Sequence, residues 1–467
     1  MRTIHARSTR PTDFAADRSD DVPNVKSARR GRDVGRSTPI VEPAAPPIPW
    51  RRVLQLVGAT SVPVFLAYTA FAARDVMFGD GAELTAAAIV NGVAHPPGYP
   101  LWIMLGHLAA LVPLGSPAFR VNITACAYHA LTVGLVVASA FVLTRRSAAS
   151  VIAGLLLGIA SPLFVSWSLQ AEVFSLDDLV AAAIALLSLL WLDDPRRWRL
   201  ALALGVLFGL GLSNQQSLVL LAPLPIWSAW CGRSAFRGTR AWMMLLGGVA
   251  IVPVSFMLPY IHTLVVSPHF PGALGAASTP SQLLDLIDRS AYGTLSLTAE
   301  THGVAGNLLD RMIAIVSVAG LAFATASAGI VALAFERRRR EMVAGLLTLA
   351  GPLVVFSAVA NLGVEYDPFR AIFQRFGLLP LTAVAPFAAC FVSAVAARVE
   401  ASALRRGVLI AMAGSVLIVG ALRMPALSLA HADGQRALYA DIARVLPAHA
   451  VLLLSLIHIS EPTRQAE

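Results

Sequence analysis

Residues 120–146 read RVNITACAYHALTVGLVVASAFVLTRR, an apolar run that closes on two arginines. A helix needs about 20 mainly apolar residues to cross a bilayer, because the hydrocarbon core is about 30 Å thick. Arginines beside such a run mark its cytoplasmic end, since positively charged loops stay on the cytoplasmic side. The stretch therefore predicts a transmembrane α-helix whose carboxyl end faces the cytoplasm.

The composition of the whole chain extends this interpretation. Of the 467 residues, 57% are hydrophobic and 13% are charged, whereas soluble domains contain about 25% charged residues. The net charge of +9 comes almost entirely from arginines, which lie in short clusters between apolar runs. Such clusters orient a membrane protein and do not form a stripe that binds phosphates of a nucleic acid. The composition excludes an ordinary soluble enzyme, and we expect no nucleic-acid partner.

Apolar segments of spanning length follow one another along the chain, and they predict an all-α integral membrane protein with about eleven transmembrane helices. The segments are 53–73, 120–144, 149–168, 173–192, 199–213, 216–230, 241–264, 311–335, 342–361, 374–397 and 407–424. Residues 98–115 are also apolar, but a span there would move Arg145 and every later arginine cluster to the other side. We therefore expect an interfacial or re-entrant helix in the first outer loop, with twelve spans as the alternative.

Four regions are expected along the chain. Residues 1–48 are rich in Arg, Ser, Asp and Pro, which predicts a disordered cytoplasmic tail. Residues 49–424 form the polytopic membrane domain, and residues 425–453 begin an extracytoplasmic region that is truncated. Residues 454–467 are interpreted as an artefact, because 454–464 match the translation of a common transposase adapter used in sequencing.

Acidic residues gather in the loops that alternate with the arginine clusters, and these loops are expected to face the periplasm or cell exterior. They are Asp75, Asp80, Glu83, Glu172, Asp177, Asp178, Asp285, Asp288, Glu300, Glu365 and Asp367. The arrangement is typical of an enzyme that works at the outer surface of a bacterial inner (plasma) membrane. A transporter would instead place ionisable residues near the middle of the bilayer.

The first outer loop contains the most informative motif. Asp80 and Glu83 are three residues apart, so a helix would place both carboxylates on one face. A carboxylate at the membrane surface can act as a general base toward an acceptor hydroxyl, and Asp80 is the first candidate. The alternative is that Asp80 caps a helix running from about Gly81 to Asn91.

Other outer residues are candidate substrate ligands, each with a structural alternative. His95 and Tyr99 flank a Pro-Pro turn, where His95 either contacts a phosphate or stabilises the turn. Glu172 either binds a sugar hydroxyl or is a solvated acid at a helix start. Arg370 and Arg375 either bind a lipid phosphate or extend toward headgroups.

Four motifs resemble one multi-pass membrane family. They are DGAE at 80–83, HPPGYPL at 95–101, RVN at 120–122 and EVF at 172–174. They resemble the family first catalogued as domain of unknown function 2723, whose relatives include animal protein O-mannosyltransferases of the endoplasmic reticulum. The resemblance covers about residues 50–310, and the wider architecture resembles the GT-C glycosyltransferase superfamily, with juxtamembrane helices in the first outer loop.

This resemblance implies an inverting transferase. It would move a sugar, expected to be mannose, from a polyprenyl-phosphate carrier to a hydroxyl of a protein, glycan or lipid on the outer face of the bilayer. Asp80 and Glu83 would be catalytic, and Asn214 and Tyr292 add two family positions to the substrate-binding candidates. We expect no metal and no cofactor. A multi-pass transporter and a non-catalytic scaffold are the alternatives.

Overall fold

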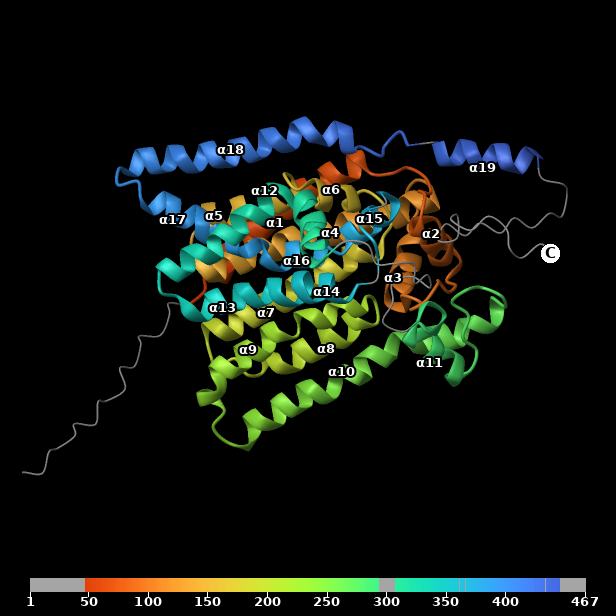
Figure 1. Cartoon of the computed structure of the whole chain (residues 1–467), viewed down its shortest axis with the longest axis horizontal. Helices are drawn as coiled ribbons and strands as arrows, with labels where there is room; N and C mark the ends of the chain where they lie inside the picture. Colours follow the sequence, from red (N-terminus) through yellow and green to blue (C-terminus); the bar gives the residue numbers. More distant parts are fainter. Residues whose placement is uncertain (1–46, 294–306, 361, 366, 433, 446–467) are drawn as a thin grey trace, which may run out of the picture. The chain divides into compact units, whose positions relative to one another are not determined.

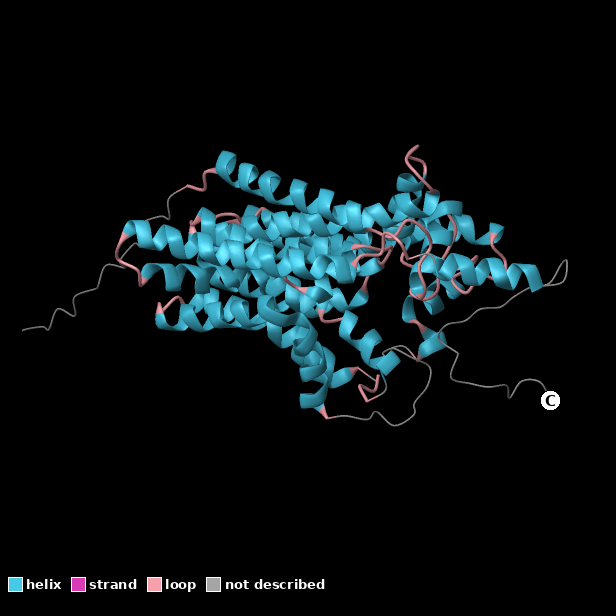
Figure 2. Ribbon diagram, turned by 90° about the horizontal axis from the view of Figure 1, so that it is seen from above, coloured by secondary structure: helices cyan, strands magenta, loops and turns pink. Residues whose placement is uncertain are grey.

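The computed structural model describes residues 47–293, 307–360, 362–365, 367–432 and 434–445. Every regular element within these residues is a helix (Figures 1 and 2). The predicted adapter-derived segment and nearly all of the predicted tail lie outside the described residues.

Eight helices or helix runs in the described part are long and apolar enough to cross a membrane. Five are single helices: α1 (Trp50–Phe71), α4 (Pro117–Thr144), α7 (Val173–Asp193), α12 (Leu308–Phe335) and α18 (Ser402–Leu427). The sixth joins α10 (Thr239–Val266) to η3 (Ser267–His269). The seventh, Arg339–Val359, contains α13 (Arg339–Leu349), η5 (Ala350–Val355) and α14 (Phe356–Val359). The eighth, Phe369–Ala397, comprises most of α15 (Asp367–Arg375), then α16 (Leu378–Val384), η6 (Ala385–Phe387) and α17 (Ala388–Ala397).

The predicted all-helical membrane architecture is confirmed for the described residues, but the count of eleven is not. Three predicted segments account for the difference. One is the pair α5 (Ser147–Gly158) and α6 (Pro162–Ser168), which is bent by 68° and makes a ninth span if both helices are taken together. The other two are α8 (Leu200–Leu212) and α9 (Pro223–Gly232), whose 13 and 10 residues are each too short. At about 1.5 Å per residue, neither reaches 30 Å.

The short helices α8 and α9 nevertheless run along α7 as a hairpin through η1 (Gln216–Leu221). Asn214 donates a hydrogen bond to the carbonyl oxygen of Val173 (3.0 Å), at the first residue of α7. At the other end, a Cβ added to Gly232 would lie 3.2 Å from the indole nitrogen of Trp191. Residues of the hairpin therefore contact both ends of the full-length span α7, although neither α8 nor α9 is long enough to span by itself.

The first outer loop contains two short helices, α2 (Asp80–Val90) and α3 (Pro100–Ala110). Helix α3 falls within the ambiguous segment 98–115 and has 11 residues, so it is about 16 Å long. It is too short to span, as the pattern of arginine clusters requires. Between the two helices, Gly98 and Tyr99 both have positive φ (94° and 45°), which turns the chain sharply back on itself.

Close helix packing depends on glycines, as expected for an apolar helix rich in small residues. A Cβ added to Gly205 of α8 would lie 2.0 Å from the carbonyl oxygen of Gly248 in α10. At Gly209, the added Cβ would lie 2.4 Å from the carbonyl oxygen of Val252. The backbones of α8 and α10 thus meet directly, where any side chain would separate them.

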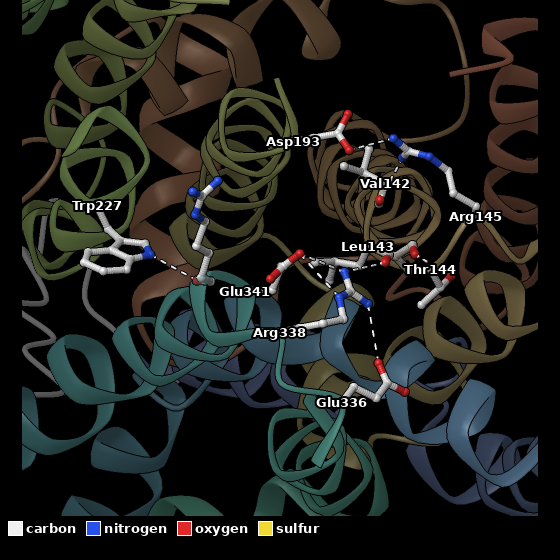
Figure 3. Close-up of polar contacts among 11 residues, drawn as sticks. Val142, Leu143, Thr144, Arg145, Asp193, Trp227, Glu336, Arg338 and Glu341 are labelled. Atoms are coloured by element: carbon white, nitrogen blue, oxygen red, sulfur yellow. Dashed lines mark hydrogen bonds and ion pairs between the residues drawn. The ribbon is translucent and has the colours of Figure 1, made fainter. Parts of the chain in front are cut away.

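Two of the arginine clusters expected to share one side of the membrane, those of Arg145 and Arg338, lie together. Arg145 donates to Asp193 (2.6 Å), which joins the ends of α4 and α7 (Figure 3). Arg338, in the turn between α12 and α13, donates to Glu341 (3.1 Å) and to the carbonyl oxygen of Leu143 (2.9 Å). These contacts stabilise the ends of the helices through charged side chains that remain partly exposed.

Two acids assigned to an outer loop lie elsewhere, so that prediction was wrong for them. Asp177 and Asp178 are 1% and 0% exposed within α7. Asp178 lies 3.1 Å from Nε2 of His129 in α4, and Nδ1 of His129 lies 2.7 Å from the Ser168 hydroxyl of α6. Helix α7 begins at Val173, earlier than a loop reaching Asp178 would allow, and His129 compensates in part for the burial of Asp178.

Candidate functional site

The candidate site is centred on Arg375, the last residue of α15. Its Nη1 lies 3.1 Å from Oδ2 of Asp80 and 3.0 Å from Oε1 of Glu172. The guanidinium also lies over the rings of Trp167 and Phe174, with 5.4 and 5.6 Å between its central carbon and the ring centroids. Residues nearly 300 positions apart therefore meet around one buried cation, whose side chain is 13% exposed.

Asp80 does not cap its helix. It is the first residue of α2, and the N-cap position belongs to Gly79, which has φ of 80° and makes no side-chain cap bond. The Asp80 side chain turns instead to Arg375, which binds one carboxylate oxygen. Its side chain is 28% exposed, and in the described structure Oδ1 makes no hydrogen bond. One oxygen is thus anchored, while the other can accept a proton.

Glu83 binds the turn that follows α2. Its Oε1 accepts the backbone N–H of His95 (2.8 Å), and its Oε2 lies 2.5 Å from Nδ1 of the same residue. Burial lowers the pKa of His95, but the hydrogen bond and charge of Glu83 outweigh this effect, so the pKa is raised overall. Tyr99 continues the chain of contacts, with its hydroxyl 3.4 Å from Nε2 of His95. Glu83 therefore orders His95 and Tyr99 beside Asp80.

Glu172 is a buried carboxylate, 3% exposed, immediately before α7. Burial raises its pKa to about 7, although the neighbouring Arg375 charge lowers it. Its Oε2 is buried with no hydrogen-bond partner in the described structure. Two side chains donate hydrogen bonds to the main chain here. The indole N–H of Trp102 donates to the carbonyl oxygen of Glu172 (3.1 Å), and the side-chain amide of Asn214 donates to the carbonyl oxygen of Val173. Asn214 thus contacts the backbone beside the carboxylate.

The remaining predicted residues differ in whether they lie near the Asp80–Arg375–Glu172 cluster. The ring of Tyr292 lies 5.4 Å from the guanidinium of Arg289, and burial together with the charges of Glu83 and Asp80 raises the pKa of its hydroxyl. Arg370 is exposed, whereas Arg375 is buried among the acids. The structure therefore groups Asp80, Glu83, His95, Tyr99, Glu172, Tyr292 and Arg375, places Asn214 behind Glu172, and leaves Arg370 at the surface.

Sequence reasoning missed the roles of Asn122 and Trp167. Asn122 donates to the carbonyl oxygens of Ala73 and Asp75 (3.0 Å each), and its Oδ1 accepts the N–H of Ala171 (2.9 Å). It thereby fastens the start of the first outer loop to the loop before Glu172. The RVN motif had drawn notice to Asn122, but its partners lie 47 to 49 residues away and no local pattern indicates them.

The described residues contain no group of three or more His, Cys, Asp or Glu side chains that could hold a metal ion. At the centre of the cluster, the position between Asp80 and Glu172 is taken by the guanidinium of Arg375.

The fold and the site define a multi-pass helical membrane protein with an acid–arginine cluster at the ends of its helices. Residues 80–235 match the family described as Protein O-mannosyl-transferase TMEM260 N-terminal domain. The matched range begins at Asp80 and contains Glu83, His95, Tyr99 and Glu172.

Two curated relatives are similar over a longer range. The mouse protein O-mannosyl-transferase TMEM260 is 31% identical over 365 residues, which cover 74% of this chain and 50% of the relative. The corresponding protein of Dictyostelium discoideum is 23% identical over 338 residues, covering 65% of this chain and 40% of the relative. The chain is thus similar to part of these protein O-mannosyl-transferases, and its matched region spans half or less of their length.

Proposed function

We propose that this protein is an inverting glycosyltransferase of the bacterial inner membrane. It moves a mannosyl group from a polyprenyl-phosphate carrier to a hydroxyl of a protein acceptor on the outer side. The observation that carries the proposal is the Asp80–Arg375–Glu172 cluster, in which Asp80 keeps one carboxylate oxygen free. The similarity to protein O-mannosyl-transferases supports mannose as the sugar and a protein as the acceptor.

In this mechanism Asp80 is the general base. Its free oxygen takes the proton of the acceptor hydroxyl as the acceptor oxygen attacks the anomeric carbon of the sugar. The bond between that carbon and the phosphate oxygen breaks, and the phosphate leaves with the bonding electrons. Attack opposite the leaving group inverts the anomeric configuration. A phosphate leaves without prior protonation, so no second catalytic acid is needed, unlike in most glycosidases.

Glu172 and Arg375 prepare the site for this step. A buried polar atom without a partner costs about 1–3 kcal/mol, so a sugar hydroxyl that donates to Oε2 of Glu172 would remove that cost. Arg375 holds Asp80 and Glu172 through the same nitrogen, which sets the base relative to the sugar ligand. Phosphate binding by Arg375 stays a prediction, since two carboxylates already face its charge.

One observation favours a different class of protein. His129 and Asp178 pair within spans α4 and α7, and buried ionisable residues inside spans commonly mark transport pathways. A transporter is therefore the second candidate function. The two candidates differ in outcome, because a transporter would move its substrate across the bilayer without forming a glycosidic bond.

The test compares the wild type with Asp80→Asn. The full-length protein is reconstituted with radiolabelled polyprenyl-phosphate mannose and protein acceptors, and label in protein is counted. Losing the base should slow transfer by at least about 100-fold. Asp285→Asn is the matched control, because it makes the same change at an exposed residue of the outer helix α11 (Pro280–Asp288) and should leave transfer unchanged. Equal transfer by Asp80→Asn and the wild type would remove Asp80 from the mechanism.

A further inference from the structure

The proposed reaction releases a phosphate, and the one guanidinium of the Asp80–Arg375–Glu172 cluster is already paired with two carboxylates. Arg375 is shared between Asp80 and Glu172, and Arg370 is exposed. His95 is bound to Glu83. A departing phosphate gains most from a guanidinium that can form two hydrogen bonds and has no carboxylate of its own.

Arg289 meets this requirement. It follows α11, and its backbone adopts a left-handed conformation with φ of 57°. Among the described residues its guanidinium pairs with no carboxylate, and its Nε is buried without a hydrogen-bond partner. It lies over the ring of Tyr292, 5.4 Å from the centroid. A half-buried guanidinium without an anion is costly unless a ligand supplies one.

Helix α11 packs beside the turn that carries His95 and Tyr99. Its Leu286 lies against Gly98, where an added Cβ would be 3.1 Å away. Its residue Ile287 accepts a hydrogen bond through the carbonyl oxygen from Gln216 (2.6 Å). From the other side, the hydroxyl of Tyr260 in α10 donates to the carbonyl oxygen of Pro97 (3.0 Å) and its ring packs with Leu286 in one apolar cluster.

This packing places Arg289 at the end of the helix that lies against the turn carrying Tyr99. Burial and the charge of Asp80 raise the pKa of Tyr99, while the charges of Arg289 and Arg375 lower it. The ring of Tyr99 is therefore within electrostatic range of both guanidinium groups and of Asp80. Arg289 approaches this ring from α11, whereas Arg375 approaches from α15.

We propose that Arg289 is the phosphate-binding residue of the site. It contacts the non-bridging oxygens of the donor phosphate and stabilises the polyprenyl phosphate as the bond to the sugar breaks. This role rests on the proposed function, and it assigns separate tasks to the two arginines. Arg375 positions the carboxylates, and Arg289 binds the leaving group.

The test measures equilibrium binding of polyprenyl monophosphate, which carries no sugar. The full-length protein is placed in phosphatidylcholine nanodiscs as the wild type, Arg289→Gln, Arg289→Lys and Arg406→Gln. Removing the guanidinium should weaken binding at least about tenfold, because a charge-assisted hydrogen-bond pair is lost. Lysine should recover part of the affinity as a point charge. Arg406, exposed in α18, is the matched control and should bind within about twofold of the wild type.

Three outcomes would overturn this role. The wild type does not bind polyprenyl monophosphate, or Arg289→Gln binds it within twofold of the wild type. In the third, Arg289→Lys binds no more tightly than Arg289→Gln. If Arg289→Gln does not fold, as judged by its thermal unfolding, the comparison of Arg289→Lys with the wild type decides, and an unchanged affinity overturns the proposal. A second set of nanodiscs contains phosphatidylglycerol, and loss of wild-type binding there would show a site for lipid headgroups instead.

The binding test also separates this inference from the proposed function. Binding that depends on Arg289 without mannosyl transfer by the wild type would uphold the phosphate site and reject the transferase. Transfer by the wild type together with unaltered binding by Arg289→Gln would reject only the role of Arg289. When both hold, Arg289→Gln should also show weaker product inhibition by polyprenyl phosphate and a lower kcat.

Discussion

At the scale of single residues, the site is defined by which polar atoms have partners and which do not. Asp80 has one anchored oxygen, Glu172 has one buried oxygen without a partner, and Arg289 has no carboxylate in the described structure. Each unpaired group is a place where a substrate can supply what the protein lacks. The paired groups, Arg375 and the Glu83–His95 contact, hold these atoms in position.

The burial of Glu172 predicts a dependence of stability on pH. Its pKa rises from the ordinary 4.5 to about 7 in the folded protein, so the folded state binds a proton more tightly than the unfolded state between these values. The free energy of unfolding should therefore fall as pH rises from about 4.5 to 7, by at most about 3 kcal/mol, and be flat above. Thermal unfolding followed across this range measures it.

The matched variant for this prediction is Glu172→Gln. Its unfolding midpoint should vary less with pH than that of the wild type. The raised pKa of His95 also lowers stability as pH rises, and the charge of Glu172 contributes to that shift, so the difference between the two proteins reports Glu172 together with its effect on His95. Identical pH profiles would show that Glu172 does not titrate in this range.

At the scale of elements, short and broken helices place the site. The pair α5 and α6 bends by 68°, so that Ser168 reaches His129 and Trp167 reaches Arg375. Helices α2 and α3 are too short to span and bring Asp80 and Tyr99 to the same cluster. Uninterrupted spans leave no room for such turns, which is why the site lies where helices break.

The glycine contact between α8 and α10 makes a prediction about stability. Gly205→Ala should lower the free energy of unfolding by about 1–3 kcal/mol, because the new methyl group must displace the backbone of Gly248. Gly58→Ala in α1 is the control, since an added Cβ there meets nothing within 4 Å and alanine favours a helix. The measurement is the thermal unfolding midpoint of each variant. A Gly205→Ala protein as stable as Gly58→Ala would contradict the close packing.

At the scale of the whole molecule, charge is divided between two groups of residues. Arg145 pairs with Asp193 at the last residue of α7, and Arg338 lies beside it, whereas Glu172 lies at the opposite end of α7 and shares Arg375 with Asp80. The structure thus separates the two groups along α7, and it stays a prediction that the arginine-rich loops face the cytoplasm and the acid cluster faces outward.

Topology can be tested with a membrane-impermeant maleimide in intact cells. In a background with Cys126, Cys231 and Cys390 replaced by serine, Ser281→Cys in α11 should be labelled from outside. Arg339→Cys in α13 should react only after the membrane is opened. Both positions are exposed, so access to reagent depends on the side of the membrane. Labelling of Arg339→Cys in intact cells would show that the orientation is opposite to the predicted one and that the acid cluster faces the cytoplasm.

The sequence by itself determined the membrane class, most of the spans and most members of the candidate site. The length of an apolar run and the position of the arginines beside it are local properties. Residues 120–146 therefore predict a span without reference to the rest of the chain. The motifs at 80–83, 95–101 and 172–174 likewise pointed to Asp80, His95 and Glu172.

Only the tertiary structure decided how these residues meet. It paired Asp80 with Arg375 and not with its own helix end, buried Asp178 against His129, and left Arg289 without a carboxylate in the described part of the chain. It also showed that α8 and α9 are each too short to span, which lowered the count of full-length spans. Partners separated by tens to hundreds of residues are chosen by helix packing and by the cost of burying unpaired charge, and neither leaves a periodic signal in the sequence.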